Sequence, residues 1–392
     1  MNNHMVRLLT YVLMSLTCSS IVLGQDNPAG PDDPAALLPE LSRPKVLNVQ
    51  TPDTLEGEGE LRWSWDYEHP STTLFLRLRI RLDRLSANKS WSLRIIDENN
   101  NIVQTLTEES FIGQPPTGRW TQRIDGRKVR VELRSSSKPI DLKVVIDRLN
   151  FSYFTPGQRV LTTGSDDMRD IKQVDAKYYG YGRPTAIIFL QRATNQNETN
   201  CTGFLLTSSL MITNRHCISE DWQLQTATAE FGYESDSLTK EIRSFSKLEV
   251  QNSALDFTIL RFSTPVTSWS TVTFGLEPVR KDQPLVLIQY PSARYKTISI
   301  RDCKVMSETV LDRPNRPNDF YHLCDTEGGS SGSALMDEST GRVVGLHYYG
   351  IYRANKMGRN LAIKFTAILE CLRSDNKTLS LYNEIMGQQT NH

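Results

Sequence analysis

The chain has 392 residues, which is long for one domain, and 38% of them are hydrophobic, enough to fill two cores. Its 45 basic residues balance its 45 acidic residues, so no net charge draws the protein to nucleic acid or to an anionic membrane surface. The composition therefore predicts more than one domain and argues against nucleic-acid binding.

The N-terminal segment, residues 1–24, has the pattern of a secretory signal peptide. Arg7 precedes an apolar run over 8–23, and the predicted cleavage lies before Gln25. No later stretch is apolar for long enough to cross a bilayer, so no membrane anchor is expected. We therefore expect a secreted protein, extracellular or periplasmic, in which residues 25–44, rich in Pro, Asp and Ala, form a flexible leader.

Residues 45–153 show the alternation that is typical of half-buried strands. Apolar and polar side chains alternate over 74–82, 129–133 and 140–146, and turn signals such as Asp125-Gly126 separate such runs. This pattern predicts a small antiparallel β-sandwich, which we interpret as an accessory domain or a prodomain. The arginines at alternate positions of the first run are expected to form a solvated outer face.

The tryptophans of this predicted sandwich admit two interpretations. They are Trp63, Trp65, Trp91 and Trp120. On the surface they would stack against a carbohydrate or protein ligand, whereas in a sandwich tryptophan is more often part of the core. The residues that follow, 154–181, have the Gly-rich and polar composition of a linker.

Three short segments carry a base, an acid and a nucleophile in this chain order. His216 lies in Thr-Asn-Arg-His-Cys, Asp256 opens the apolar strand Asp-Phe-Thr-Ile-Leu, and Ser331 lies in Gly-Gly-Ser-Ser-Gly-Ser-Ala. A buried acid needs a partner, and a histidine N–H is a suitable one. Gly329 and Gly332 flank the serine and permit a turn that directs backbone N–H groups at a developing oxyanion. The three residues are therefore a candidate catalytic triad.

These motifs lie in a part of the chain, from about residue 178 to 381, that resembles the chymotrypsin-fold serine peptidases. Within them it is most similar to the bacterial-type glutamyl endopeptidases and their trypsin-like relatives. The matching segments are 201–207, 213–217, 256–260, 289–291, 324–334, 345–347 and 360–363. The resemblance implies an all-β protein in which the sandwich precedes a chymotrypsin-like double β-barrel with a C-terminal helix. The peptidase domain would span 182–385, before a polar tail over 386–392.

The resemblance also implies an activity, the hydrolysis of peptide bonds in protein or peptide substrates through an acyl-enzyme. Ser331 would be the nucleophile, His216 the general base and Asp256 the residue that orients the histidine. The N–H groups of Gly329 and Ser331 would form the oxyanion hole, and no metal or organic cofactor is needed. The rival interpretation is a catalytically silent secreted binding protein on the same fold, although all three triad residues are retained.

Five cysteines follow the predicted signal peptide. We expect one disulfide between Cys201 and Cys217, pinning the histidine loop, and a second between Cys303 and Cys324, bracing the approach to the nucleophile loop. Cys371 is then left over and is expected to be a buried thiol. The cysteines and histidines lack the close paired spacing of a zinc site.

Substrate preference is expected to depend on Asp325, Thr326 and His347. Asp325 lies six positions before Ser331, where trypsin keeps the acid that pairs with Lys or Arg, whereas Thr326 and His347 match the groups that grip a substrate carboxylate in glutamyl endopeptidases. A histidine favours an acidic side chain over a lysine, so we expect cleavage after Glu, with trypsin-like cleavage as the alternative. In a third interpretation, His347 only fills the barrel wall and Asp325 bonds to nearby backbone.

The residue before the nucleophile bears on activation. It is Ser330, whereas trypsin-like zymogens place there an aspartate that receives the newly cut N-terminus, so that ion pair cannot form. Cleavage within the 154–181 linker, with release of the sandwich as a prodomain, is the alternative route that we consider.

Overall fold

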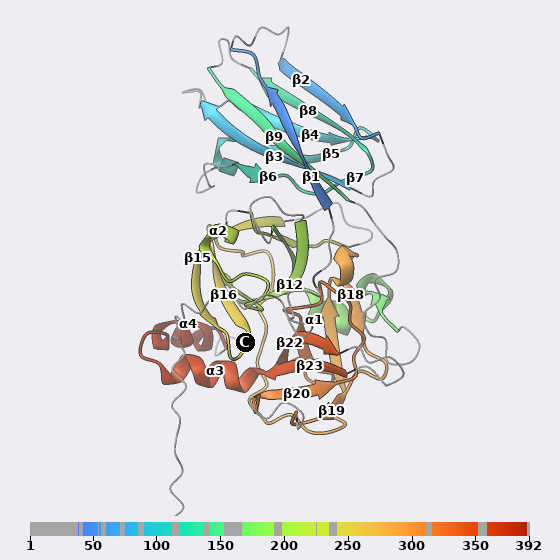
Figure 1. Cartoon of the computed structure of the whole chain (residues 1–392), viewed down its shortest axis with the longest axis vertical. Coiled ribbons are helices and arrows are strands. Elements are labelled where there is room, and N and C mark those ends of the chain that lie inside the picture. Colours follow the sequence, from blue (N-terminus) through green and yellow to red (C-terminus); the bar gives the residue numbers. More distant parts are fainter. Residues whose placement is uncertain are drawn as a thin grey trace, which may run out of the picture.

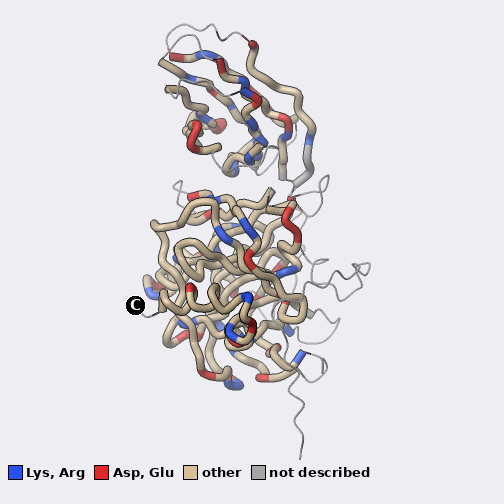
Figure 2. The backbone as a smooth tube through the Cα atoms, turned by 90° about the vertical axis from the view of Figure 1, so that its left-hand side faces the viewer, with Lys and Arg blue, Asp and Glu red and all other residues tan. Residues whose placement is uncertain are grey.

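The computed structural model describes residues 38, 42–53, 55, 60–70, 75–84, 90–111, 118–136, 141–152, 167–191, 198–224, 226–234, 241–310, 316–351 and 359–389. The predicted signal peptide and most of the predicted leader lie outside these residues. Figure 1 shows an elongated molecule with the N-terminal strands at one end and the other strands and the helices at the other. Basic and acidic residues are interspersed along both parts (Figure 2). Among the described residues, no helix combines the length and apolar character that a membrane crossing requires.

The N-terminal strands form two sheets, as the alternation of apolar and polar side chains predicts (Figure 1). One sheet has the order β2-β8-β4-β5, and the other has the order β1-β9-β3-β6 with β7 also paired to β3. The strands are β1 (Ser42–Gln50), β2 (Leu61–Glu68), β3 (Phe75–Arg84), β4 (Trp91–Asp97), β5 (Ile102–Leu106), β6 (Arg119–Trp120), β7 (Ile124–Asp125), β8 (Lys128–Ser135) and β9 (Lys143–Ser152). All their pairings are antiparallel, and apolar side chains such as Leu78, Leu93 and Val131 fill one shared core.

The prediction of a solvated arginine face is wrong for Arg77 on β3. Its side chain is fully buried, because it contacts the adjoining barrel instead of solvent. Two of the four tryptophans, Trp91 and Trp120, are only 2% exposed and so belong to the interior. An exposed stacking surface that includes these two residues is therefore excluded.

Beyond the sandwich, the chain forms a first barrel from six strands. They are β11 (Thr185–Gln191), β12 (Glu198–Thr207), β13 (Leu210–Thr213), β14 (Thr228–Phe231), β15 (Glu241–Asn252) and β16 (Phe257–Phe262). The barrel is closed because β11 pairs with both β14 and β12. A short helix, α2 (Asp221–Leu224), follows the loop that contains His216. The sandwich joins this barrel at Ser42 of β1, which pairs with Glu198 of β12.

The second barrel is built on an eight-stranded sheet with the order β10-β18-β17-β21-β22-β23-β20-β19. The strands are β10 (Arg169–Asp170), β17 (Leu285–Gln289), β18 (Thr297–Ser299), β19 (Val305–Ser307), β20 (Asp319–His322), β21 (Ala334–Asp337), β22 (Val343–Ile351) and β23 (Arg359–Lys364). The double barrel that the resemblance implies is thus confirmed. An apolar core shared by the two barrels includes Phe204 and Ile288.

The structure differs from the sequence predictions in two regions that contain helices. The second half of the predicted linker contains β10, a 3-10 turn and α1 (Ala176–Gly182), and β10 pairs with β18 of the second barrel. Two C-terminal helices are present where one is expected, α3 (Phe365–Ser374) and α4 (Leu379–Gln389). The second helix continues to Gln389, so it includes part of the predicted polar tail.

Candidate active site

His216 and Asp256 meet at the mouth of the first barrel. The His216 Nδ1 atom lies 2.7 Å from the Asp256 Oδ2 atom, and the backbone N–H of His216 donates to Oδ1 of the same carboxylate over 3.0 Å. Both carboxylate oxygens therefore bind the one residue, which fixes the orientation of the imidazole. The two side chains are only 6% and 11% exposed.

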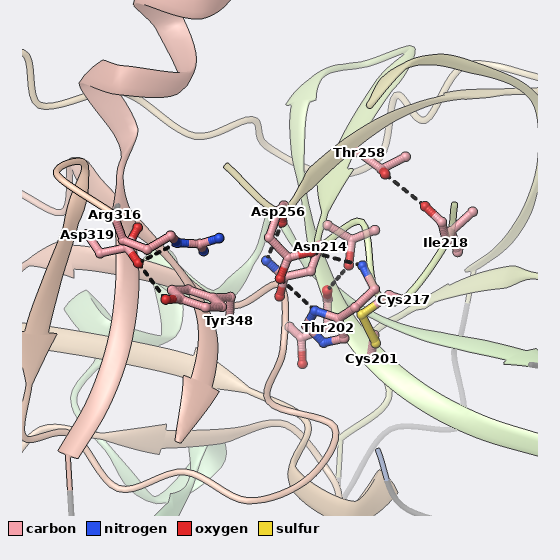
Figure 3. A network of polar contacts seen from close by, with 12 residues as sticks. Cys201, Thr202, Asn214, Cys217, Ile218, Asp256, Thr258, Arg316, Asp319 and Tyr348 are labelled. Carbon is pink, nitrogen blue, oxygen red and sulfur yellow. Dashed lines mark hydrogen bonds and ion pairs between the residues drawn. A yellow bond between two sulfur atoms is a disulfide. The ribbon is translucent and has the colours of Figure 1, made fainter. Parts of the chain in front are cut away.

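The backbone at Asp256 is held in an unusual conformation. Its φ of 44° lies in the left-handed region, which is costly for a residue other than glycine unless its surroundings support it. The support comes from the histidine loop: the Asn214 side-chain amide and the Arg215 N–H both donate to the Asp256 carbonyl oxygen, over 2.9 and 3.2 Å. Figure 3 shows Asn214 beside Asp256. Sequence reasoning missed Asn214, although it lies two residues before His216.

The predicted disulfides are both present in the structure. Cys201 is bonded to Cys217, next to His216, and Cys303 is bonded to Cys324. Donor atoms of Cys201, His216 and Cys217 lie within 4.8 Å of one another, but sulfurs in a disulfide are not the thiolates that bind a metal ion. The described residues contain no free cysteine, so the expectation of a leftover Cys371 thiol is wrong.

The nucleophile loop around Ser331 depends on two glycines with positive φ. Gly329 has a φ of 94° and Gly332 a φ of 86°, as the flanking glycines predict. At Gly332 a Cβ atom would lie 2.0 Å from the Thr202 carbonyl oxygen and 2.4 Å from Thr213 Oγ1. Only glycine can therefore bring the nucleophile loop this close to the first barrel.

Two hydrogen bonds from Thr202 hold the nucleophile loop on the first barrel. Its N–H donates to the Ser331 carbonyl oxygen over 2.8 Å, and its hydroxyl donates to the Gly329 carbonyl oxygen over 2.9 Å. Thr213, which contacts Gly332, lies three residues before His216 on the neighbouring strand. The loops of His216 and Ser331 are thus brought together across the two barrels.

Some polar atoms at the site have no hydrogen-bond partner among the described residues. The His216 Nε2 atom is buried and has no hydrogen bond to a described residue. Among the described residues, the N–H groups of Gly329 and Ser331 also donate no hydrogen bond, whereas the neighbouring Ser330 and Gly332 N–H groups bind Glu327 and His347 carbonyl oxygens. Two donors of this kind on one loop can bind an anionic oxygen.

The side chains of Asp325 and Thr326 both form hydrogen bonds within the protein. The Asp325 Oδ2 atom accepts a hydrogen bond of 3.0 Å from the Asp167 N–H, and its side chain is 3% exposed. The Thr326 hydroxyl donates to Asn360 Oδ1 over 3.0 Å, and Asn360 in turn donates to the Cys324 carbonyl oxygen. The engagement of Asp325 with backbone agrees with the third interpretation of that residue.

His347 forms a pair with a histidine that sequence reasoning missed. His322 Nε2 lies 3.0 Å from His347 Nδ1, and both side chains are buried. Burial lowers the pKa of His347 to about 3, with a further contribution from His216, while the Leu361 carbonyl opposes the shift. Burial and the neighbouring His347 also lower the pKa of His322 well below its ordinary value. Both imidazoles are therefore neutral at neutral pH.

An arginine that sequence reasoning did not single out also points toward Asp256 (Figure 3). Arg316 Nε donates to Asp319 Oδ2 over 2.9 Å, and its guanidinium lies 4.9 Å from the Tyr348 ring centroid. Burial alone would lower the pKa of Arg316, but Tyr348, Asp319 and Asp256 together raise it. The cation therefore adds positive potential near the Asp256 carboxylate.

Comparisons with known proteins concern mainly the second half of the chain. Residues 201–346 match the family model described as the trypsin-like peptidase domain. The uncharacterized protein y4fB of Sinorhizobium fredii is 30% identical over 167 residues, which are 38% of this chain and 25% of that protein. The secreted RxLR effector protein 73 of Plasmopara viticola is 24% identical over 209 residues, 50% of this chain and 52% of that protein. The match thus spans between a quarter and about half of the length of these relatives.

Similar solved structures include two proteases. The serine endoprotease from Yersinia pestis has 16% sequence identity and a TM-score of 0.39, with 50% of this chain and 66% of that chain covered. The active form of the Rv3671c protease from M. tuberculosis has 16% identity and a TM-score of 0.40, with 57% and 93% covered. The segment that contains His216, Asp256 and Ser331 resembles the trypsin-like peptidase domain. This family match supports a chymotrypsin-fold serine peptidase.

Proposed function

We propose that the protein is a secreted serine endopeptidase that cleaves peptide bonds through an acyl-enzyme. Ser331 Oγ attacks the substrate carbonyl while His216 Nε2 takes the hydroxyl proton, and the same proton then goes to the leaving amine. Water hydrolyses the resulting ester by the same route. Asp256 keeps the imidazole in the tautomer with a proton on Nδ1 and stabilises its cationic form.

The observation that carries this proposal is the hydrogen bond between His216 Nδ1 and Asp256 Oδ2 beside an unused Nε2 atom. A histidine that a carboxylate holds through Nδ1, with Nε2 free, can exchange a proton at Nε2. The mechanism also requires hydrogen-bond donors for the oxyanion of the tetrahedral intermediate. The N–H groups of Gly329 and Ser331, which donate to no described residue, can be these donors. A missing bond between Ser331 and His216 does not argue against the mechanism, because such bonds often tighten only when substrate binds.

Cleavage after Glu is the substrate preference that we favour. His347 is bonded through its backbone to the two residues that follow Ser331, donating to Ser333 and accepting from Gly332. A substrate carboxylate would favour the protonated form of His347 and so oppose the lowering of its pKa, whereas a lysine or arginine side chain would lower that pKa further. Thr326 extends the same polar wall toward Asn360.

The trypsin-like alternative depends on Asp325. Its carboxylate binds the Asp167 N–H, so a substrate cation would compete with a contact that already exists. Profiling of cut sites on a peptide library separates the two preferences. A preference for Lys or Arg that is lost in Asp325→Ala and kept in His347→Ala would reject the glutamyl assignment.

The competing class is a catalytically silent secreted protein that uses the fold for binding. A fluorophosphonate probe distinguishes it, because the probe labels only an activated serine in a formed oxyanion hole. We expect labelling of the wild-type protein and none of Ser331→Ala. Absence of labelling in the folded wild-type protein would overturn the proposed function.

Secretion rests on the predicted signal peptide and on the two disulfides, which persist in oxidising compartments. One relative is also named as a secreted protein. A mass spectrum of the mature protein would give the signal cut and any cut in the 154–181 segment. A carbohydrate or protein ligand of the sandwich has no support from the described tryptophans and remains an untested prediction.

A further inference from the structure

A cluster of aromatic and aliphatic side chains joins the sandwich to both barrels. It contains Phe75 of β3 together with Ile187, Phe189, Tyr233, Tyr290 and Ala293 of the barrels. Arg123 of the sandwich, only 6% exposed, lies in this cluster. Its guanidinium is 3.8 Å from the Phe75 ring centroid and 4.7 Å from that of Tyr233. Such cation–π contacts are strongest where water is excluded, so Arg123 is held firmly between the two parts.

Arg123 is hydrogen-bonded to the turn that supports the nucleophile loop. Its Nη1 atom donates to the Ala293 carbonyl oxygen over 2.9 Å. The preceding residue, Ser292, donates its N–H to the Gly328 carbonyl oxygen over 2.6 Å, and Gly328 directly precedes Gly329. A single turn therefore separates a sandwich side chain from an expected oxyanion-hole donor.

This turn has a backbone conformation that needs external support. Ser292 and Ala293 have φ values of 47° and 53°, in a region that costs about 1 to 2 kcal/mol per residue for side chains other than glycine. Arg294, which follows, forms an ion pair of 2.7 Å with Glu327 of the nucleophile loop. The turn is thus tied to the loop on one side and to Arg123 on the other.

A second connection runs through Arg77 and one face of β12. Arg77 forms an ion pair with Glu198 and donates to Thr228 Oγ1 over 3.0 Å, all within the buried interface. Glu198, Asn200 and Thr202 lie on the same face of β12, because side chains alternate along a strand. Asn200 donates to the Tyr290 carbonyl oxygen over 2.7 Å and packs against Gly329, and Thr202 binds the Gly329 carbonyl oxygen.

We propose that the sandwich is a permanent part of the active enzyme, in which Arg123 and Arg77 position the oxyanion-hole loop from a distance. Both are positioning residues, since neither touches the substrate. The inference rests on the proposed peptidase function and adds a structural control of its oxyanion hole. It also replaces the prodomain interpretation: a cut in the 154–181 segment would leave the sandwich bound.

The buried interface, with its ion pairs and apolar cluster, is the reason that the sandwich stays bound. Separation would leave Glu198, which is 1% exposed, without the cation that opposes its burial, and would also remove the cation 3.9 Å from Glu230. Burial raises the pKa of Glu198, while Arg77 lowers it. Dissociation would also expose the apolar cluster around Phe75, Phe189 and Tyr290 to water, which is unfavourable.

The test replaces Arg123 with methionine, which keeps the length of the side chain and removes the donor to Ala293. The matched control is Arg79→Met, because Arg79 also lies on the sandwich and binds Asp147 of the same domain. Three quantities are measured in each full-length variant: kcat and KM on a library-derived peptide, the rate of fluorophosphonate labelling, and amide hydrogen exchange across 326–333. Arg123→Lys, which keeps the cation over the aromatic rings, serves as a second variant should Arg123→Met fail to fold.

We expect Arg123→Met to lower kcat and the labelling rate ten- to hundredfold at an unchanged KM, and to speed exchange at 328–332. Arg79→Met should change none of kcat, KM, the labelling rate and the exchange. Wild-type kcat and exchange in a folded Arg123 variant, or an equal loss in Arg79→Met, would overturn the inference. If the wild-type protein is inactive, the proposed function fails, whereas the exchange comparison still decides whether Arg123 controls the loop.

Discussion

The backbone N–H of Thr202, on the first barrel, donates a hydrogen bond of 2.8 Å to the carbonyl oxygen of Ser331. Because Thr202 follows the cysteine that is disulfide-bonded next to His216, one strand connects the candidate base with the candidate nucleophile. The same strand begins at Glu198, which binds the sandwich. The three parts of the molecule therefore meet along β12.

Replacement of either Ser331 or His216 by alanine is expected to abolish proteolysis without unfolding the protein. Both side chains act in the transition state. Because they work as one unit, replacing either one is expected to lower the rate roughly a million-fold. The measurement is kcat/KM together with the circular dichroism spectrum. If the alanine variant at position 331 retained a tenth of the activity, another residue would have to be the nucleophile.

Gly332→Ala is expected to lower the free energy of unfolding by roughly 3 kcal/mol and to abolish activity. The new Cβ would lie 2.0 Å from a backbone oxygen at a φ of 86°, so the loop must move. Gly180→Ala is the matched control, since it makes the same chemical change on α1 with nothing within 4 Å of the new Cβ. Chemical denaturation of both variants provides the comparison, and equal stability of the two would contradict the close approach of the loop to Thr202.

Reduction of the disulfides is expected to destabilise the barrels and not the sandwich. Both described disulfides lie in the barrels, and closing the Cys201–Cys217 loop contributes on the order of 3 kcal/mol. Thermal melting of the full chain, followed separately by tryptophan fluorescence and by labelling with the fluorophosphonate probe, measures the effect. A Tm for loss of labelling that does not move with reductant would show that this disulfide does not stabilise the histidine loop.

Acid is expected to destabilise the second barrel through the His322–His347 pair. The pKa of each is lower in the folded protein than in the unfolded chain, so the unfolded chain binds more protons below about pH 6.5. The stability contributed by the neutral pair is therefore complete above that pH and is lost as the pH falls toward about 3. Each proton changes the unfolding free energy by about 1.4 kcal/mol per pH unit within this window.

The check is urea unfolding at several pH values between 7 and 4, in the wild-type protein and in His322→Gln. The variant removes one titrating group and keeps a side-chain amide that can bind His347. Its stability should therefore depend less steeply on pH. If the pH dependence of the unfolding free energy is the same in His322→Gln as in the wild-type protein, proton binding by His322 does not contribute to it.

Arg77→Met is expected to be more destabilising than the double variant Arg77→Met/Glu198→Gln. The single change leaves the Glu198 carboxylate buried without its partner, which typically costs about 3 to 5 kcal/mol, whereas the double change removes the charge as well. Arg130→Met, which breaks an exposed ion pair with Asp66, is the control and should have little effect. Unfolding free energies from denaturation curves rank the variants, and a double variant as unstable as the single one would rule out a charge effect.

Elements with a local sequence pattern could be predicted without the structure. Alternating side chains predicted the sandwich strands, and the glycines that flank Ser331 predicted a turn with positive φ. The double barrel was implied by the resemblance to the chymotrypsin-fold serine peptidases. The first two predictions succeed because strand periodicity and glycine conformation depend on neighbouring residues. The association of His216 with Asp256 was also predicted, since a buried acid requires a partner.

Which face of a strand is buried against another domain depends on tertiary packing. The arginines of β3 have the periodicity of a solvated face, yet Arg77 is buried because the first barrel packs against it. His322 gave no sequence signal, since it meets His347 only after β20 and β22 fold into one sheet. Asp325 likewise is engaged by Asp167, 158 positions earlier in the chain. Contacts between distant residues depend on how the domains pack, and a single sequence carries no local pattern for them.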